Sequence, residues 1–154
     1  MEEKMKKITK ACLALILLSL ALLALASCSK DSGKFDEGDK MTLVVAEEEA
    51  KVFEIPLSDF KKSDSVIDLL QYLKSEGKLN YETSGTMVTK VGNLKNEGNG
   101  YIYFYTTVEK DVDVSEYATT VQYGNVSITS SGVGAESMHL ENGAIVYIGI
   151  VVWG

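Results

Sequence analysis

The chain has 154 residues, of which 45% are hydrophobic and 24% charged, and its formal net charge is −7. All fifteen basic residues are lysine, so the chain lacks the planar guanidinium fork that favours bidentate contacts with phosphates and bases. This composition argues against nucleic-acid binding and against adhesion to anionic lipid through a basic patch. It leaves cations and neutral ligands as the expected partners of a folded, acidic domain.

Residues 1–27 have the pattern of a secretory signal peptide. Four lysines between Lys4 and Lys10 precede the nearly unbroken apolar run Ala11–Ala26. The run spans about 16 residues, whereas a helix needs roughly 20 to cross a bilayer. We therefore expect cleavage after residue 27, with an uncleaved membrane anchor as the alternative. Either outcome places the folded part outside the cytoplasm.

The end of this segment, Leu25-Ala26-Ser27-Cys28, resembles the lipobox of bacterial lipoproteins. The resemblance implies diacylglycerol on the Cys28 sulfur, cleavage before Cys28, and a protein held on the extracytoplasmic side of the membrane in the cell envelope. Acyl chains hold firmly, because each buried methylene contributes about 0.8 kcal/mol. Cleavage would also discard Cys12, which excludes thiol catalysis, disulfides and cysteine–metal sites in the mature chain.

The next segment, residues 28–40, is polar, charged and glycine-containing, with a single aromatic residue. Such composition buries too little apolar surface to order itself, so we expect a flexible tether. The remaining chain, residues 41–154, is long enough for one modest domain with its own core.

The domain begins with two β-rich runs, residues 41–46 and 51–56, on either side of Glu47-Glu48-Glu49, and this pattern predicts a hairpin with a charged turn. A helix is predicted from residue 65, with Ser65 and Asp68 in a capping box and Gly77 as the stop. Its apolar residues fall at helical spacing on one face: Val66, Leu69, Leu70 and Leu73.

Strands and glycine- or asparagine-rich turns are predicted for the rest of the chain. The expected strands are residues 87–91, 101–108, 119–123, 126–129 and 144–153. The last run is apolar on both faces, which is typical of a central strand. A hairpin followed by one helix and further strands indicates an α+β fold, with a β-grasp-like mixed sheet and the helix packed across it.

Three segments resemble the transcobalamin-like C-terminal domain, a bacterial surface domain of unknown function. Ser65-Val-Ile-Asp-Leu-Leu70 is similar to its helix start, Tyr101-Ile-Tyr-Phe-Tyr105 to its aromatic strand, and Glu141–Tyr147 to its closing turn and strand. The chain departs from the family at Thr106-Thr107-Val108 and at Ala144. The resemblance implies a β-grasp-like fold and a role beside a corrinoid. In cobalamin carriers a separate helical domain covers the other side of that ligand.

The strongest candidate site is the alternation of Tyr101, Tyr103 and Tyr105 with Ile102 and Phe104. In a strand it places three tyrosines on one face. They would form a flat aromatic platform for a sugar, corrinoid or peptide, or simply the outer face of a half-buried sheet. Trp153 either closes the core, which its apolar strand favours, or extends the aromatic surface.

Other candidate motifs are incomplete. His139 is the only histidine and is expected at a turn or the surface, near Ser137 but without a nucleophile motif. The segment Asp111–Glu116 begins like a calcium loop but lacks the glycine and the final glutamate, which favours a solvated acidic loop. The segment Ser131–Gly134 lacks the strand-to-helix context of a phosphate loop. We expect no catalytic residue, metal site or cofactor.

These patterns predict a non-catalytic, membrane-anchored binding module. Its ligand, a corrinoid or a glycan, would lie near Tyr101, Tyr103, Tyr105 and Trp153. The alternative is an accessory subunit of a surface or transporter assembly that contacts a protein and has no small-molecule ligand. An enzyme is the least favoured class, since no motif pairs the acidic groups, and the chain offers one histidine and no arginine.

Overall fold

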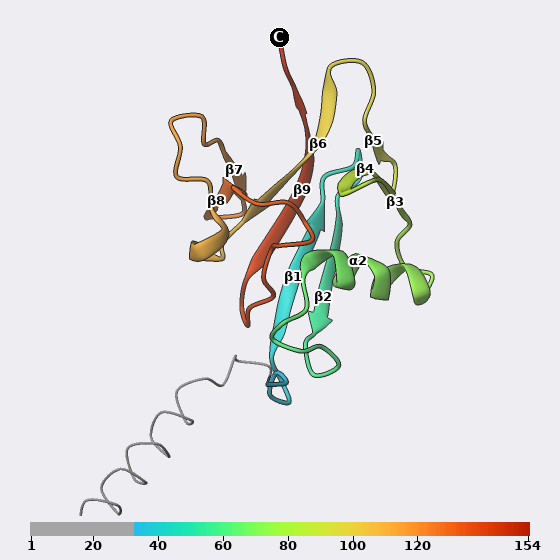
Figure 1. Cartoon of the computed structure of the whole chain (residues 1–154), viewed down its shortest axis with the longest axis vertical. Coiled ribbons are helices and arrows are strands. Elements are labelled where there is room, and N and C mark those ends of the chain that lie inside the picture. Colours follow the sequence, from blue (N-terminus) through green and yellow to red (C-terminus); the bar gives the residue numbers. More distant parts are fainter. Residues whose placement is uncertain (1–32) are drawn as a thin grey trace, which may run out of the picture. The chain divides into compact units, whose positions relative to one another are not determined.

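A computed structural model of the chain describes residues 33–154, in which six strands form the main sheet (Figure 1). The signal peptide and Cys28 lie outside the described residues. The strand order is β2-β1-β9-β6-β8-β7. The strands are β1 (Lys40–Val45), β2 (Lys51–Pro56), β6 (Gly100–Thr106), β7 (Thr120–Tyr123), β8 (Val126–Ser130) and β9 (Ile145–Val152). Among residues 33–154, no helix has the length and hydrophobicity needed to span a bilayer.

A second, three-stranded sheet and one α-helix complete this mixed α+β fold. The small sheet contains β3 (Tyr81–Ser84), β4 (Met87–Val91) and β5 (Leu94–Lys95). The helix is α2 (Val66–Ser75), and a 3-10 turn, η1 (Glu109–Asp111), follows β6. The predicted hairpin, helix and longer strands are therefore present, whereas β3 and β5 were not predicted.

β9 is a central strand, as its apolar sequence predicted. It runs parallel to β1, with Thr42 opposite Ile145 and Val45 opposite Ile148. On its other side it pairs antiparallel with β6 along the whole length of β6, from Gly100 opposite Val152 to Thr106 opposite Val146. A strand with neighbours on both sides and layers over both faces retains no polar face, which explains its sequence.

The helix α2 begins and ends where the sequence indicated. The Ser65 N–H donates to Asp68 Oδ2 at 2.8 Å, and Ser65 Oγ donates to the same oxygen at 2.9 Å. At the other end Gly77 adopts φ +67°, a conformation that glycine takes readily. The apolar residues of the helix are buried against the sheet, in a core whose largest fully buried side chains include Met41, Leu43, Ile55, Leu57, Leu69, Leu70, Leu73, Met138 and Ile148.

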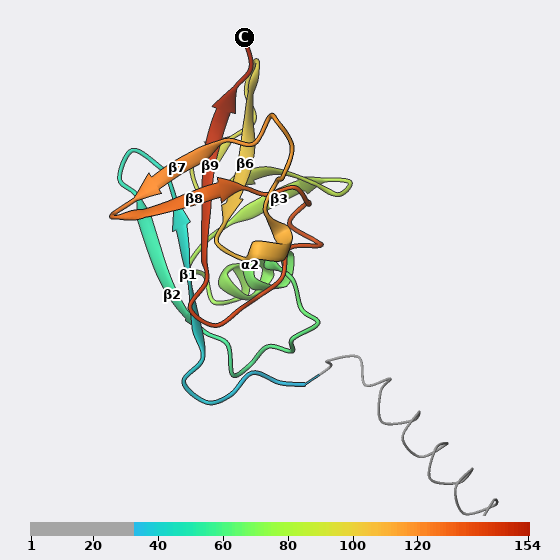
Figure 2. The same cartoon turned by 90° about the vertical axis from the view of Figure 1, so that its left-hand side faces the viewer.

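The hairpin of β7 and β8 crosses the sheet face opposite α2 (Figures 1 and 2). Strand register places Val44, Tyr147 and Tyr105 next to one another on this face. Ile128 of β8 lies two residues before Ser130, which pairs with Tyr105. Val44, Tyr105 and Ile128 are all buried, yet they are not part of the core beneath α2. The sheet is thus covered on both sides.

Residues 33–40, which composition assigned to a flexible tether, contact the domain. Phe35 packs against the core, and the Lys62 N–H donates to the Gly33 carbonyl at 2.9 Å. Lys40 already pairs with Pro56 in β1. A single aromatic side chain and a few backbone hydrogen bonds hold this segment, which its average composition does not reveal.

Candidate functional site

The three tyrosines of β6 lie on the sheet face away from α2. In the register with β9, Tyr101 is opposite Val151, Tyr103 opposite Gly149, and Tyr105 opposite Tyr147. The residues between them, Ile102 and Phe104, belong to or pack against the core on the helix side. The alternation of the sequence therefore separates tyrosine from apolar side chains in space.

The three tyrosines are not equally accessible. Tyr101 is 43% exposed and Tyr103 is half-buried, whereas Tyr105 is only 5% exposed. Tyr105 is enclosed because its strand neighbour on that side is β8, where Ser130 pairs with it and Ile128 is buried nearby. A ligand on this face would reach Tyr101 and Tyr103, with Tyr105 as the support beneath them, so the face is not a flat platform of three rings.

Trp153 extends this aromatic surface and does not close the core. It is 50% exposed, and its ring centroid lies 6.3 Å from that of Tyr103 at an interplanar angle of 73°. The preference for a core position was wrong because β9 continues past the end of β1, so that its last residues have a neighbouring strand only on the β6 side (Figure 1). The half-exposed indole and the Tyr103 ring form the most accessible aromatic pair of the site.

A chain of edge-to-face contacts fixes these rings. Tyr103 lies 5.6 Å from Tyr105, and Tyr105 lies 5.9 Å from Tyr147. Contacts of this geometry contribute about 0.5–1.5 kcal/mol each beyond the area they bury. Tyr147 was missed as a member of this cluster, although its place in β9, two residues before Gly149, puts it on the same face as Tyr105. The cluster makes the accessible pair a rigid surface.

The Tyr103 phenol is kept protonated. Burial raises its pKa above the ordinary value of 10.0, and the nearby Asp113 carboxylate and Tyr105 raise it further. Asp113 lies in the loop of residues 112–119, where the Ser115 N–H donates to its Oδ1 at 2.8 Å and lowers its pKa. At neutral pH the face therefore offers a phenolic donor beside an ionised carboxylate.

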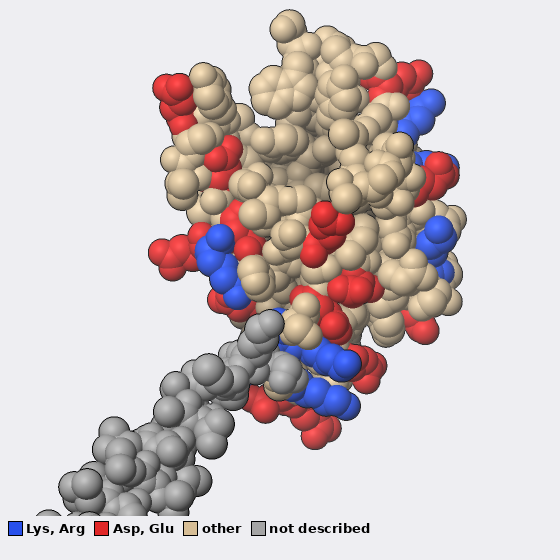
Figure 3. All heavy atoms as spheres, in the orientation of Figure 1, with Lys and Arg blue, Asp and Glu red and all other residues tan. Residues whose placement is uncertain are grey.

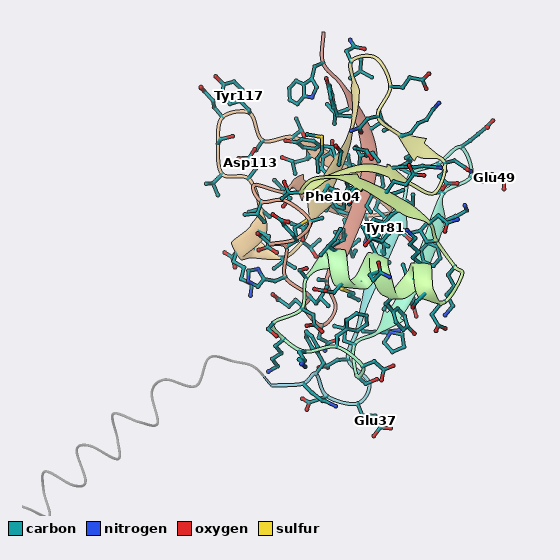
Figure 4. All side chains as sticks on the ribbon, turned by 45° about the vertical axis from the view of Figure 1, so that its right-hand side comes forward. Glu37, Glu49, Tyr81, Phe104, Asp113 and Tyr117 are labelled. Atoms are coloured by element: carbon teal, nitrogen blue, oxygen red, sulfur yellow. The ribbon has the colours of Figure 1, made fainter. Side chains whose placement is uncertain are left out.

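Figure 3 shows a hollow between uncharged atoms in the middle of the upper part of the domain, with acidic side chains on the lobe to its left and acidic and lysine side chains to its right. Figure 4 places Tyr117 at the outer end of the 112–119 loop, with Asp113 closer to the sheet. The large apolar side chains exposed on this loop, β6 and the end of β9 are Tyr101, Val114, Tyr117, Ile150, Val152 and Trp153. We call this surface the aromatic end.

An apolar pocket of about 190 Å³ lies on the helix side of β6. Its walls include Met87 of β4, Phe104 of β6 and the Ser131–Gly134 turn with Ala135. Sites for small-molecule ligands usually measure about 300–1,000 Å³. This pocket has room for an apolar group of side-chain size.

Asp111 and His139 form a buried-carboxylate pair that the sequence did not predict. His139 Nδ1 lies 2.6 Å from Asp111 Oδ1, and the His139 N–H donates to Oδ2 at 2.6 Å. Asp111 is buried, which corrects the expectation of a solvated acidic loop. No group of three or more metal-ligating side chains exists within residues 33–154, and in that range no hydrogen bond joins Ser137 to His139.

Glu47 connects the β1–β2 turn, in which it lies, to another turn of the domain. Its side chain is 5% exposed and accepts from the Asn93 N–H and Nδ2 at 2.9 Å each, while Lys51 Nζ lies 3.0 Å away. Burial raises the pKa of this carboxyl, but the Asn93 and Lys51 contacts outweigh it and lower the pKa below 4.5. Gly92 allows this approach, because a Cβ there would lie 2.0 Å from Glu47 Oε1. The β1–β2 turn is thereby fixed to the β4–β5 turn.

No protein-family model matches this chain, and no curated protein sequence matches it either. The site therefore has to be interpreted from its own geometry, in which the aromatic end brings together accessible rings and exposed apolar side chains.

Proposed function

We propose that this protein is a lipid-anchored binding module on the extracytoplasmic side of the membrane, and that its ligand contacts Tyr101, Tyr103 and Trp153. The observation that supports this most directly is the half-exposed Trp153 ring against the fixed Tyr103 ring. Aromatic faces bind planar groups and sugar rings through stacking, with large contact area and little loss of side-chain entropy. A corrinoid or a glycan fits this chemistry, and the proposal involves no catalytic step.

The connection to the anchor leaves the aromatic end accessible. Within the described domain, the start of β1 and the C-terminal end of β9 lie at opposite ends (Figure 1). An anchor on Cys28 is joined to the domain through the segment that precedes β1, so it is attached at a distance from Tyr103 and Trp153.

We propose in addition that the fold is β-grasp-like and related to the transcobalamin-like C-terminal domain. The support is topological: an antiparallel β1–β2 hairpin precedes the helix, and the last strand runs parallel to β1 and beside β6. The resemblance in the helix start, the aromatic strand and the closing strand maps onto α2, β6 and β9, the elements that build this arrangement.

A test of the ligand proposal uses the fact that Trp153 is the only tryptophan of the chain. Residues 29–154, without lipid, would be titrated with cobalamin, cobinamide, soluble glycans and peptidoglycan fragments, with Trp fluorescence and thermal midpoint as readouts. A ligand at a hundredfold its dissociation constant stabilises the domain by about 2.7 kcal/mol. We expect both signals for one compound class and their loss in Tyr103→Ala. They should persist in Tyr123→Ala, a tyrosine on β7 with no ring contact among the described residues.

A second candidate is a protein partner, which the exposed loop of residues 112–119 favours. Val114 and Tyr117 there are both largely exposed, and clustered exposed apolar side chains mark interaction surfaces. If no compound changes the Trp153 signal while the lipidated protein co-purifies with a membrane complex, and Tyr117→Ser abolishes that capture, the protein-partner function replaces the ligand-binding one.

A further inference from the structure

The outer part of β9 has a free edge. β1 pairs with β9 only as far as Val45 opposite Ile148, whereas β9 continues to Val152. The Ala46 N–H donates to the Ile148 carbonyl on the β1 side, and the Trp153 N–H donates to the Asn99 carbonyl on the β6 side. Since these directions alternate along a strand, the backbone groups of Ile150 and Val152 point to the side that β1 has left.

Within the described part of the chain, no group accepts a hydrogen bond from the N–H groups of Ile150 and Val152 on that side, and none donates one to their carbonyls. Their side chains are 39% and 65% exposed, so the edge is accessible. Figures 1 and 2 show β9 continuing beyond the end of β1 toward the C-terminal end. The edge therefore presents unpaired donors and acceptors to its surroundings.

This edge also lacks the charged and proline residues that usually block strand addition. Natural edge strands carry lysine, proline or inward-pointing charges, or are very short. The outer edge of the same sheet, β2, has Lys51, Glu54 and Pro56, but residues 149–154 contain neither a charge nor a proline. An unprotected apolar edge of this kind is suited to pairing with another strand.

We propose that a second copy of this chain adds its β9 to this edge, antiparallel and related by a two-fold axis. A pairing that joins Val152 of each copy to Val152 of the other places Ile150 of each copy opposite Gly154 of the other. It satisfies the free backbone groups of Ile150 and Val152 in both strands and stops short of Ile148, beside which β1 ends. It leaves every hydrogen bond of β9 with β1 and β6 intact. This proposal depends on the strand edge and is independent of the ligand proposed above.

Charge distribution favours a second copy at this place. Residues 33–154 contain ten lysines and nineteen acidic residues, a net charge of −9, so two copies repel one another over most of their surfaces. Residues 149–154, which form this edge, carry no charged side chain, and Figure 3 shows uncharged atoms in the middle of the upper part of the domain. Two identical acidic domains can approach there with the least electrostatic cost.

The test is sedimentation equilibrium of residues 29–154, which contain the whole compact unit of residues 33–154. The protein concentration runs from about 10 μM to about 1 mM, the range in which association through a short interface is measurable. We expect the weight-average mass to rise toward twice the monomer mass. Val152→Pro removes a free edge N–H that bonds to nothing in the described domain, and it should hold the protein at monomer mass over the whole range. Val152→Ala retains that N–H and should associate like the wild type.

Thermal unfolding of Val152→Pro accompanies the measurement, since an unchanged midpoint shows that the variant is folded. A wild-type domain that stays monomeric up to about 1 mM overturns the proposal. So does a Val152→Pro variant that associates as the wild type does, because then the contact uses another surface. If proline at this position unfolds the domain, amide hydrogen exchange of Val152 in the wild type replaces this variant. Protection of Val152 that is present at high protein concentration and absent at low concentration supports the proposal. The same exchange rate at both concentrations overturns it.

Discussion

Replacing Glu47 with glutamine is expected to destabilise the domain, although it only exchanges one carboxylate oxygen in a turn for an NH₂ group. Glutamine retains one carbonyl oxygen but places an NH₂ group against one of the two Asn93 donors, which now lie 2.9 Å from the carboxylate. A hydrogen bond to a charged group is worth about 1.5–3 kcal/mol. The Lys51 pair adds about 0.2–1 kcal/mol, since the lysine is half exposed. We expect a total loss of about 2–4 kcal/mol.

The pH dependence of this loss follows from the pKa of Glu47, which is lowered in the folded state below its ordinary value of 4.5. A carboxyl with a depressed folded-state pKa stabilises the fold fully above its unfolded-state pKa, and the stabilisation disappears as the pH falls through the folded-state pKa. The difference between wild type and Glu47→Gln should therefore be constant from pH 7 to about pH 5 and decrease below that.

Urea unfolding followed by circular dichroism measures both effects, and thermal melts provide a second readout. With about 120 ordered residues, each kcal/mol moves the midpoint by about 4 °C, so a decrease of roughly 8–16 °C is expected at pH 7. Glu48→Gln is the matched control, because Glu48 is exposed in the same turn and should change stability by less than about 0.5 kcal/mol. Equal effects of the two substitutions at pH 7 would refute the role assigned to Glu47.

Three further substitutions test the packing that positions the site. Asp111→Asn leaves the two His139 nitrogens with one carbonyl acceptor and should cost about 1.5–3 kcal/mol in urea unfolding; no change would mean that the pair is not formed in solution. Gly92→Ala should cost clearly more than Gly124→Ala, since both have φ near +60° and only Gly92 has a side chain within reach; similar losses would contradict the close approach. Ser65→Ala removes the helix cap and should lower the free energy of unfolding by about 1 kcal/mol, which denaturant titration resolves.

Local sequence determined the elements with strong short-range signals. The helix from Val66 follows from a capping pair and apolar spacing within a few residues, and the hairpin of residues 41–56 follows from two β-rich runs around a charged turn. The apolar run of β9 also indicated its central position. In contrast, β3 has the polar sequence Tyr81-Glu-Thr-Ser84 and becomes a strand only because β4 lies beside it. Four residues carry too little local preference to predict such pairing.

The sequence also predicted only part of the candidate site. Alternation along β6 determined that Tyr101, Tyr103 and Tyr105 share a face, because the geometry of a strand permits nothing else. Which of them a ligand can reach was decided by β8, which encloses Tyr105, and by the end of β1, which leaves Trp153 uncovered.

The contacts between distant segments were decided by tertiary structure alone. Asp111 and His139 are 28 residues apart, and Glu47 and Asn93 are 46 residues apart. Sequence by itself determined the periodicity, the caps and the uncharged character of β9, since those depend on neighbours within a few positions. Burial of a carboxylate or exposure of an indole depends on which remote strands arrive beside it, and only the assembled sheet determines that.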